Sequence, residues 1–156
     1  MDFNEITRRL AEYNRDAGLF IDQILTISSV WDDLIDKDKT IDDSKVNAAF
    51  ELSLVHLPRN KFYMAHFNEL NPIVISSIQN WYIANKIERN NDEDKFNISF
   101  IIRSSYADLI TMTAYILGGT EFSQEIGEAA RAFAHDEGIE GYKQALLKEI
   151  SDRGDK

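Results

Sequence analysis

The sequence predicts an all-α protein, a single-domain bundle of six or seven helices around one apolar central helix. Apolar residues recur at spacings of three and four over most of the chain, which is the repeat of an amphipathic helix. Only two prolines and seven glycines occur, so few residues can break a helix. The chain has neither a strand-like alternation of apolar and polar residues nor an Asn-Gly or Asp-Gly hairpin turn. These features favour helices packed on helices.

Two helices are expected at the start of the chain. Asp2 is a suitable N-cap for the first, whose apolar face consists of Phe3, Ile6, Leu10 and Tyr13. Gly18 either ends this helix or loosens it. The second helix carries an acidic cluster near its C-terminal end, and its apolar face consists of Phe20, Ile24, Ile27, Trp31 and Leu34.

Three more helices are expected in the middle of the chain. The first follows an acidic cap at residues 42–44 and runs to Leu57, where the next residue is proline. A short helix is expected over residues 60–70. Asn71-Pro72 is a typical helix start, so a longer helix is expected from there to about Arg89.

The last part of the chain is expected to hold the central helix. Residues 96–117 are apolar on nearly every side, which is typical of a buried helix. Gly118 and Gly119 end it, and shorter helices follow over 123–135 and 139–151. Because short neighbours in one chain leave part of such a helix uncovered, we expect a homodimer.

The composition limits the function classes. The chain has 156 residues, the size of one ordinary domain, and it has no cysteine, which excludes disulfides and zinc-thiolate sites. The net charge of −10 opposes docking on phosphate backbones and anionic membranes, so we expect neither a direct nucleic-acid partner nor a membrane partner. Charges interrupt the first ten residues and no apolar run is long enough for a bilayer, so we expect a cytoplasmic protein.

The strongest functional signal is a cluster of carboxylates at the end of the second expected helix. Asp32, Asp33 and Asp36 lie within one turn or so of each other, and Asp38 follows closely. Their mutual repulsion is costly unless a cation or water offsets it. Oxygen ligands of this kind suit Mg²⁺, so Asp32, Asp33 and Asp36 are candidate metal ligands. The alternative is an exposed acidic helix end.

A second set of polar side chains follows one face of the helix that is expected to end near Arg89. Trp81, Asn85, Glu88 and Asp92 are spaced by four, three and four residues. Asn85 and Glu88 are therefore further candidate metal ligands, facing the first set. The alternative is a polar surface stripe.

The apolar segment 96–117 also contains polar residues that need partners if they are buried. Arg103 and Asp108 are the candidate catalytic residues, with Arg103 binding a substrate phosphate. Alternatively, Arg103 forms an internal ion pair with Asp108 or with a carboxylate of another helix. The histidines lack the spacing of a zinc site, and no phosphate-binding glycine loop or nucleophile motif is present.

The run Asp32-Asp33-Leu34-Ile35-Asp36 resembles the first aspartate-rich motif of isoprenoid diphosphate synthases. That family is all-α and binds Mg²⁺ and a substrate diphosphate through this motif. The resemblance covers the motif and the apolar helix before it, and it implies that Asp32, Asp33 and Asp36 are metal ligands.

A larger part of the chain, residues 20–120, looks like small uncharacterised helical proteins encoded in tailed-phage genomes. The segments that carry this resemblance are 30–36, 57–62, 80–88 and 103–108. It implies an origin, and a host-cytoplasm location, without an activity.

Two functions of different classes therefore follow from the sequence. The first is Mg²⁺-dependent binding or turnover of a phosphorylated or diphosphate small molecule through the aspartate cluster. The alternative is a non-catalytic phage interaction or assembly protein that self-associates, in which the cluster is a solvated surface.

Overall fold

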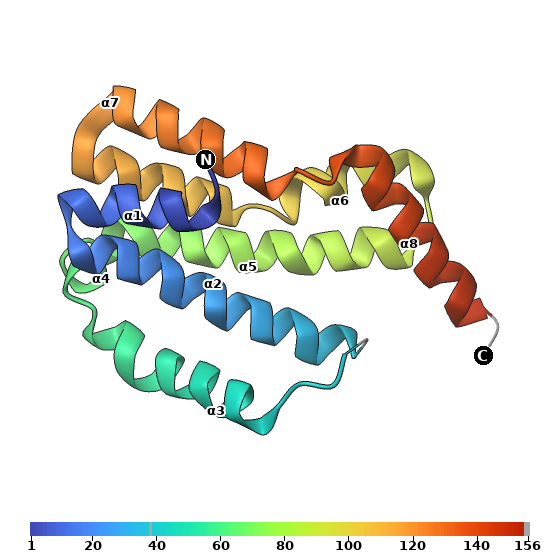
Figure 1. Cartoon of the computed structure of the whole chain (residues 1–156). Helices are drawn as coiled ribbons and strands as arrows, with labels where there is room; N and C mark the ends of the chain where they lie inside the picture. Colours follow the sequence, from blue (N-terminus) through green and yellow to red (C-terminus); the bar gives the residue numbers. More distant parts are fainter. Residues whose placement is uncertain (38, 155–156) are drawn as a thin grey trace.

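The computed structural model describes residues 1–37 and 39–154, and it confirms the all-α fold (Figure 1). No strand occurs within these residues. The α-helices are α1 (Phe3–Tyr13), α2 (Arg15–Asp36), α3 (Asp43–Glu51), α4 (Lys61–Ala65), α5 (Phe67–Arg89), α6 (Phe96–Ile102), α7 (Tyr106–Ala134) and α8 (Gly138–Gly154). Shorter segments are a π-helical turn, η1 (Leu52–His56), and two 3₁₀ turns, η2 (Leu57–Arg59) and η3 (Glu93–Lys95).

The first two helices are packed unusually closely. The backbone N–H of Glu5 donates to Asp2, which confirms the expected cap of α1, and α1 ends where Asn14 becomes extended and caps α2. Gly18 lies inside α2, so the expectation that it ends a helix is wrong. A Cβ atom at Gly18 would lie 2.7 Å from the carbonyl oxygen of Thr7, so glycine permits this approach of α2 to α1.

The central region differs from the predicted boundaries at two places. The third helix is regular only in α3, and continues as η1 and η2 through Pro58. The long helix starts at Phe67 rather than at Asn71, and Pro72 lies inside α5. The side chain of Asn71 donates to the hydroxyl of Tyr63 at 2.9 Å, so it ties α5 to α4 instead of capping a helix.

The prediction of one continuous central helix over residues 96–117 is wrong. It is divided into α6 and the first part of α7 by a turn at Arg103, Ser104 and Ser105. The Ser105 hydroxyl donates to the carbonyl of Ile102 at 2.7 Å, a local bond of the kind that competes with helix continuation. Ile98 and Ile101 of α6 are exposed, so this segment is not buried on all sides.

The helix α7 is a hairpin of two antiparallel arms. Gly119 has φ 77° and ψ −162°, outside the helical region, and the chain reverses there, as expected for the Gly118-Gly119 pair (Figure 1). The arms pack closely, because a Cβ atom at Gly127 would lie 2.7 Å from the hydroxyl of Thr111. An ion pair between Asp108 and Arg131 at 2.5 Å joins them further along.

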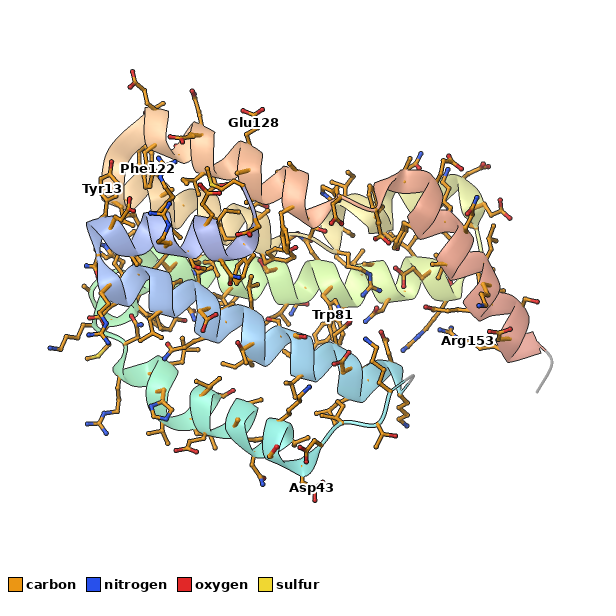
Figure 2. All side chains as sticks on the ribbon, in the orientation of Figure 1. Tyr13, Asp43, Trp81, Phe122, Glu128 and Arg153 are labelled. Atoms are coloured by element: carbon orange, nitrogen blue, oxygen red, sulfur yellow. The ribbon has the colours of Figure 1, made fainter. Side chains whose placement is uncertain are left out.

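One hydrophobic core joins α1, the first half of α2, the α4–α5 junction and both arms of α7. Its largest fully buried side chains include Phe20, Ile6, Leu10, Leu70, Leu109, Ile110 and Ile126. At the end of this core, Tyr13 stacks on Phe122 with ring centroids 4.5 Å apart (Figure 2). No helix in the described part of the chain has the length and hydrophobicity needed to cross a membrane.

Candidate functional site

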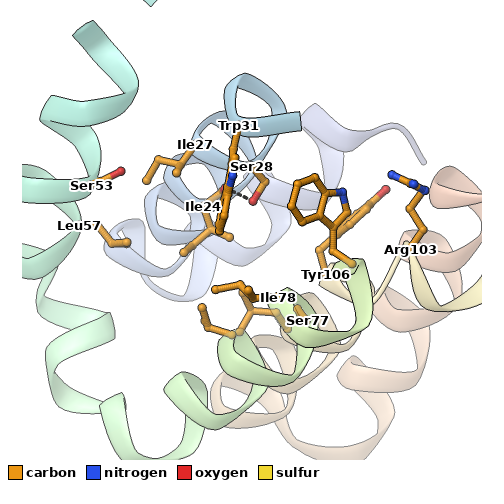
Figure 3. A pocket seen from close by; sticks show the side chains of 13 residues that line it. Ile24, Ile27, Ser28, Trp31, Ser53, Leu57, Ser77, Ile78, Arg103 and Tyr106 are labelled. Carbon is orange, nitrogen blue, oxygen red and sulfur yellow. Dashed lines mark hydrogen bonds between the residues drawn. The ribbon is translucent and has the colours of Figure 1, made fainter. Parts of the chain in front are cut away.

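The second half of α2 borders a cavity of about 260 Å³ (Figure 3). Its walls come from α2, η1, η2, α5 and the start of α7, and most of them are apolar. The lining residues are Ile24, Ile27, Ser28, Trp31, Ser53, Leu57, Val74, Ser77, Ile78, Trp81, Arg103, Tyr106 and Leu109.

Aromatic side chains hold α2 and α5 apart beside this cavity. Trp31 of α2 meets Trp81 of α5 with ring centroids 5.3 Å apart, and the ring of Tyr82 lies edge-on to Trp31 at 6.3 Å. Two indole rings between the helices occupy far more width than the small residues at the α1–α2 contact. The space next to them is therefore not filled by side chains.

Three serines place hydroxyl groups in the otherwise apolar wall. Ser28 donates to the carbonyl of Ile24 and Ser53 to that of Ala49, each at 2.8 Å, so their protons are used within their own helices. The hydroxyl of Ser77 is buried and has no hydrogen-bond partner among the described residues. Because an unpaired buried hydroxyl is costly, Ser77 is suited to a hydrogen bond with a ligand or a water molecule.

Arg103 closes one end of the cavity and is held by α5. Its Nε donates to Glu88 Oε1 at 3.0 Å, and its Nη2 donates to Glu88 Oε2 and to Asn85 Oδ1, each at 2.6 Å. Burial disfavours the charge of Arg103, but the contacts with Glu88, and the more distant Asp32, raise its guanidinium pKa above the ordinary value. The side chain stays charged and fixed, with Nη1 directed toward Asp32 at 3.5 Å.

The structure places Asp32 beside Arg103 and Trp81. The indole Nε1 of Trp81 donates to Asp32 Oδ1 at 3.0 Å, and this bond joins α5 to the end of α2. Asp33 lies 3.9 Å from the ammonium group of Lys39. Asp36 is the last residue of α2, and Asp38 lies outside the described residues.

A wider groove of about 760 Å³ lies next to the cavity and shares part of its lining. Asp32 and Asp33 line it, and it shares Ser28, Trp81, Arg103 and Tyr106 with the cavity. Arg103 and Trp81 therefore form a common wall, with the apolar cavity on one side and the carboxylates on the other.

The remaining candidate residues are paired with other side chains of the protein. Asn85 and Glu88, considered as metal ligands, hold Arg103 in place. Asp108 pairs with Arg131 of the second arm of α7, not with Arg103. Of the two ion pairs considered for Arg103, the structure contains the one with a carboxylate of another helix, Glu88 of α5.

Tyr142 of α8 also contacts Glu88, the carboxylate that holds Arg103, although the sequence did not indicate a role for this tyrosine. Its hydroxyl donates to Glu88 Oε1 and lies 2.9 Å from the hydroxyl of Ser99. Burial and the bond to Glu88 raise the pKa of Tyr142 to about 12. No sequence signal marked Tyr142, because it lies in an ordinary amphipathic helix far along the chain from α5.

Across residues 1–37 and 39–154, no three histidine or acidic side chains are grouped so that they could hold a metal ion. Comparison with known proteins finds no matching family model, no matching curated protein and no matching solved structure. The two resemblances noted in the sequence therefore stay predictions, and the function is inferred from the residues of the site.

Proposed function

We propose that this protein binds a small phosphorylated molecule with an apolar body, together with Mg²⁺. The apolar body lies in the cavity, and the phosphate lies at the wall formed by Arg103 and Trp81. The observation that carries this proposal is the junction at that wall, where an apolar chamber, a fixed guanidinium group and Asp32 meet.

The cavity has the size and lining for an apolar group. Engineered cavities of about 150 Å³ with aliphatic and aromatic walls bind benzene. The present cavity of about 260 Å³ has room for a body larger than that. Ser77 supplies one polar contact on the way to the charged end.

The carboxylates require a cation before a phosphate can bind near them. Mg²⁺ keeps several waters and commonly uses one or two carboxylates together with phosphate oxygens. Asp32 and Asp33, with Asp36 one turn further, would supply these protein ligands. A site of this kind needs no preformed group of three acids, and Arg103 would bind another phosphate oxygen through Nη1.

Asn85 and Glu88 would position Arg103 rather than bind the ion. If the ligand is also turned over, Arg103 is the group placed to offset charge that develops on a leaving phosphate. Asp108, paired with Arg131, would stabilise the hairpin that carries this part of the site. We further propose that the protein acts in the cytoplasm.

The test is the melting temperature with and without ligands. We expect millimolar Mg²⁺ to raise it more than a monovalent salt of equal ionic strength, and added diphosphate to raise it further, because ligands that bind only the native state stabilise it. Asp32→Asn with Asp36→Asn should abolish both shifts. The control is Glu121→Gln with Glu128→Gln, which changes the charge equally at the surface of α7. An Mg²⁺ shift that is absent from the wild type, or that persists in the aspartate variant, would contradict the proposal.

A second candidate is a non-catalytic interaction or assembly protein, such as tailed phages encode. The observation that favours it is the number of large apolar side chains exposed around the cavity on α2, α3, η1 and α5. If the protein has only this second function, Mg²⁺ should not raise the melting temperature more than a monovalent salt of equal ionic strength does.

A further inference from the structure

Exposed apolar side chains occur on the four elements α2, α3, η1 and α5 that lie at or next to the cavity. Six of them are Trp31 and Ile35 of α2, Phe50 and Leu54 of α3 and η1, and Ile75 and Tyr82 of α5. We call these six residues the apolar rim. Leu54 is 74% exposed and Phe50 is 60% exposed, which are high values for residues of this kind.

The rim residues lie on both sides of the cavity, and those of α2 and α5 are in contact. Trp31 and Tyr82 are in ring contact, and Ile35 lies one turn beyond Trp31. Neighbours of the other members line the same cavity, with Ser53 beside Leu54 and Val74 beside Ile75. The π-helical turn η1 contributes to the exposure, since Leu54, Val55 and His56 are all exposed in succession.

The rim is large enough for a stable interface. Side chains of this size with these exposures present about 600–700 Å² in total, close to the ~800 Å² that each partner buries in an interface of standard size. A surface of this area is expected to be covered.

We propose that a second copy of this chain covers the rim, in a two-fold symmetric dimer. The rim has a ridge, Phe50 and Leu54, beside a face on α5, Ile75 and Tyr82, with the cavity between them. In a two-fold pair, the ridge of each copy packs on the α5 face of the other, so one surface supplies both halves of the contact.

The charges beside the rim fit this pairing. Glu51 follows Phe50 on the ridge, and Lys86 lies one turn beyond Tyr82 on the α5 face; both are exposed. Ridge-on-face packing places an acid of one copy near a base of the other at both ends of the interface, which favours this register. The inference does not depend on the proposed ligand, because no residue of the rim except Trp31 lines the cavity.

The absence of cysteine allows a direct test, in metal-free buffer. Leu54→Cys and Ile75→Cys each introduce one thiol at the rim, and Leu19→Cys introduces one at an exposed apolar site in the first half of α2. When the protein concentration is raised from about 1 to 100 μM, we expect maleimide labelling of the two rim thiols to slow roughly tenfold. The reason is that mass action raises the fraction of dimer, in which these thiols are buried. Labelling at residue 19 should not change.

Sedimentation provides the second measurement. The wild type should sediment as a dimer at about 100 μM, the range in which an interface of this size is populated. Leu54→Lys with Ile75→Lys should be monomeric with an unchanged helical circular dichroism spectrum, and Leu19→Lys should remain a dimer. A monomeric wild type with concentration-independent labelling would overturn the inference, as would equal protection of the thiol at residue 19.

Discussion

The two halves of α2 have opposite environments. The first half packs on α1, α4 and α7, and its buried residues are Ala17, Gly18, Phe20, Ile21 and Gln23. In the second half, no residue of α2 is buried, although Trp31, Leu34 and Ile35 are large and apolar. The helix is therefore anchored in the core at one end and borders the cavity and the groove at the other.

This difference separates the part of α2 that stabilises the fold from the part for which we propose a binding role. Close packing in the first half leaves no room for a ligand, and small residues bring the backbones together. The second half borders a cavity that also contains the unpaired hydroxyl of Ser77 of α5, and it ends in a cluster of charges; all of these cost stability. Features that cost stability and persist in a native fold are most simply explained by function.

The largest expected effect lies in the packed half. Phe20→Ala should lower the free energy of unfolding by about 3–5 kcal/mol, because the side chain is fully buried. Trp31→Ala in the open half should cost less, about 2 kcal/mol, although it removes a larger side chain, because 36% of Trp31 is exposed. Urea denaturation of both variants measures the difference. Equal losses would mean that the two halves are not distinct.

The next effect concerns the charged cluster. Arg103→Met should cost about 2–4 kcal/mol, because it leaves Glu88, whose side chain is 14% exposed, without its cation. Adding Glu88→Leu should recover most of that loss, since both charges are then absent. Chemical denaturation of the two variants checks this. A double variant as unstable as the single one would show that the ion pair stabilises the fold, and that it is not maintained for a ligand.

A smaller effect tests the close approach of α1 and α2. Gly18→Ala should cost about 1–3 kcal/mol, since the new Cβ would lie 2.7 Å from a backbone oxygen. Gly141→Ala in α8 is the matched control, because its Cβ would meet nothing closer than 3.9 Å. The control should stabilise the protein by about 0.5–1 kcal/mol through helix propensity. Thermal denaturation of both variants measures these changes. A Gly18→Ala variant that is more stable than the wild type would contradict the close packing of α1 on α2.

The smallest effect depends on pH. Tyr142→Phe should cost about 1 kcal/mol at neutral pH, because the bonds to Glu88 and Ser99 are lost. The folded pKa of about 12 lies above the unfolded value near 10, so this stabilisation is complete below about pH 10 and is lost as the pH rises toward 12. The difference in unfolding free energy between wild type and Tyr142→Phe should shrink over that interval.

Much of the fold could be predicted from local sequence patterns. The Asp2 cap, the acidic end of α2 and the reversal at Gly119 depend on residues that lie next to each other in the chain, and all three are confirmed. The break at Arg103 could not be predicted from hydrophobicity, because it depends on hydrogen bonds of Ser105 with Ile102 and with Asn80 of α5. Pro72 misled the prediction, since a proline near the start of α5 is also tolerated.

The sequence indicated which residues belong to the candidate site, but not how they contact one another. The residues Asp32, Asn85, Glu88 and Arg103 stood out in the sequence, and the structure brings them together. Their pairing was not predictable, because it depends on how α2, α5 and α6 are placed in space. Ser77 and Tyr142 carried no signal, since a lone serine or tyrosine in a helix is unremarkable until its neighbours are known.

Tryptophan fluorescence tests the central claim most directly, because the two tryptophans of the chain both line the cavity. Benzyl phosphate, which has an apolar body and a phosphate group, should change the emission saturably, and more tightly with Mg²⁺ than without it. Asp32→Asn with Asp36→Asn should remove the Mg²⁺ dependence, and Glu121→Gln with Glu128→Gln should keep it. No saturable change in the wild type, or the same Mg²⁺ dependence in the aspartate variant, would contradict a ligand site between the cavity and the aspartates.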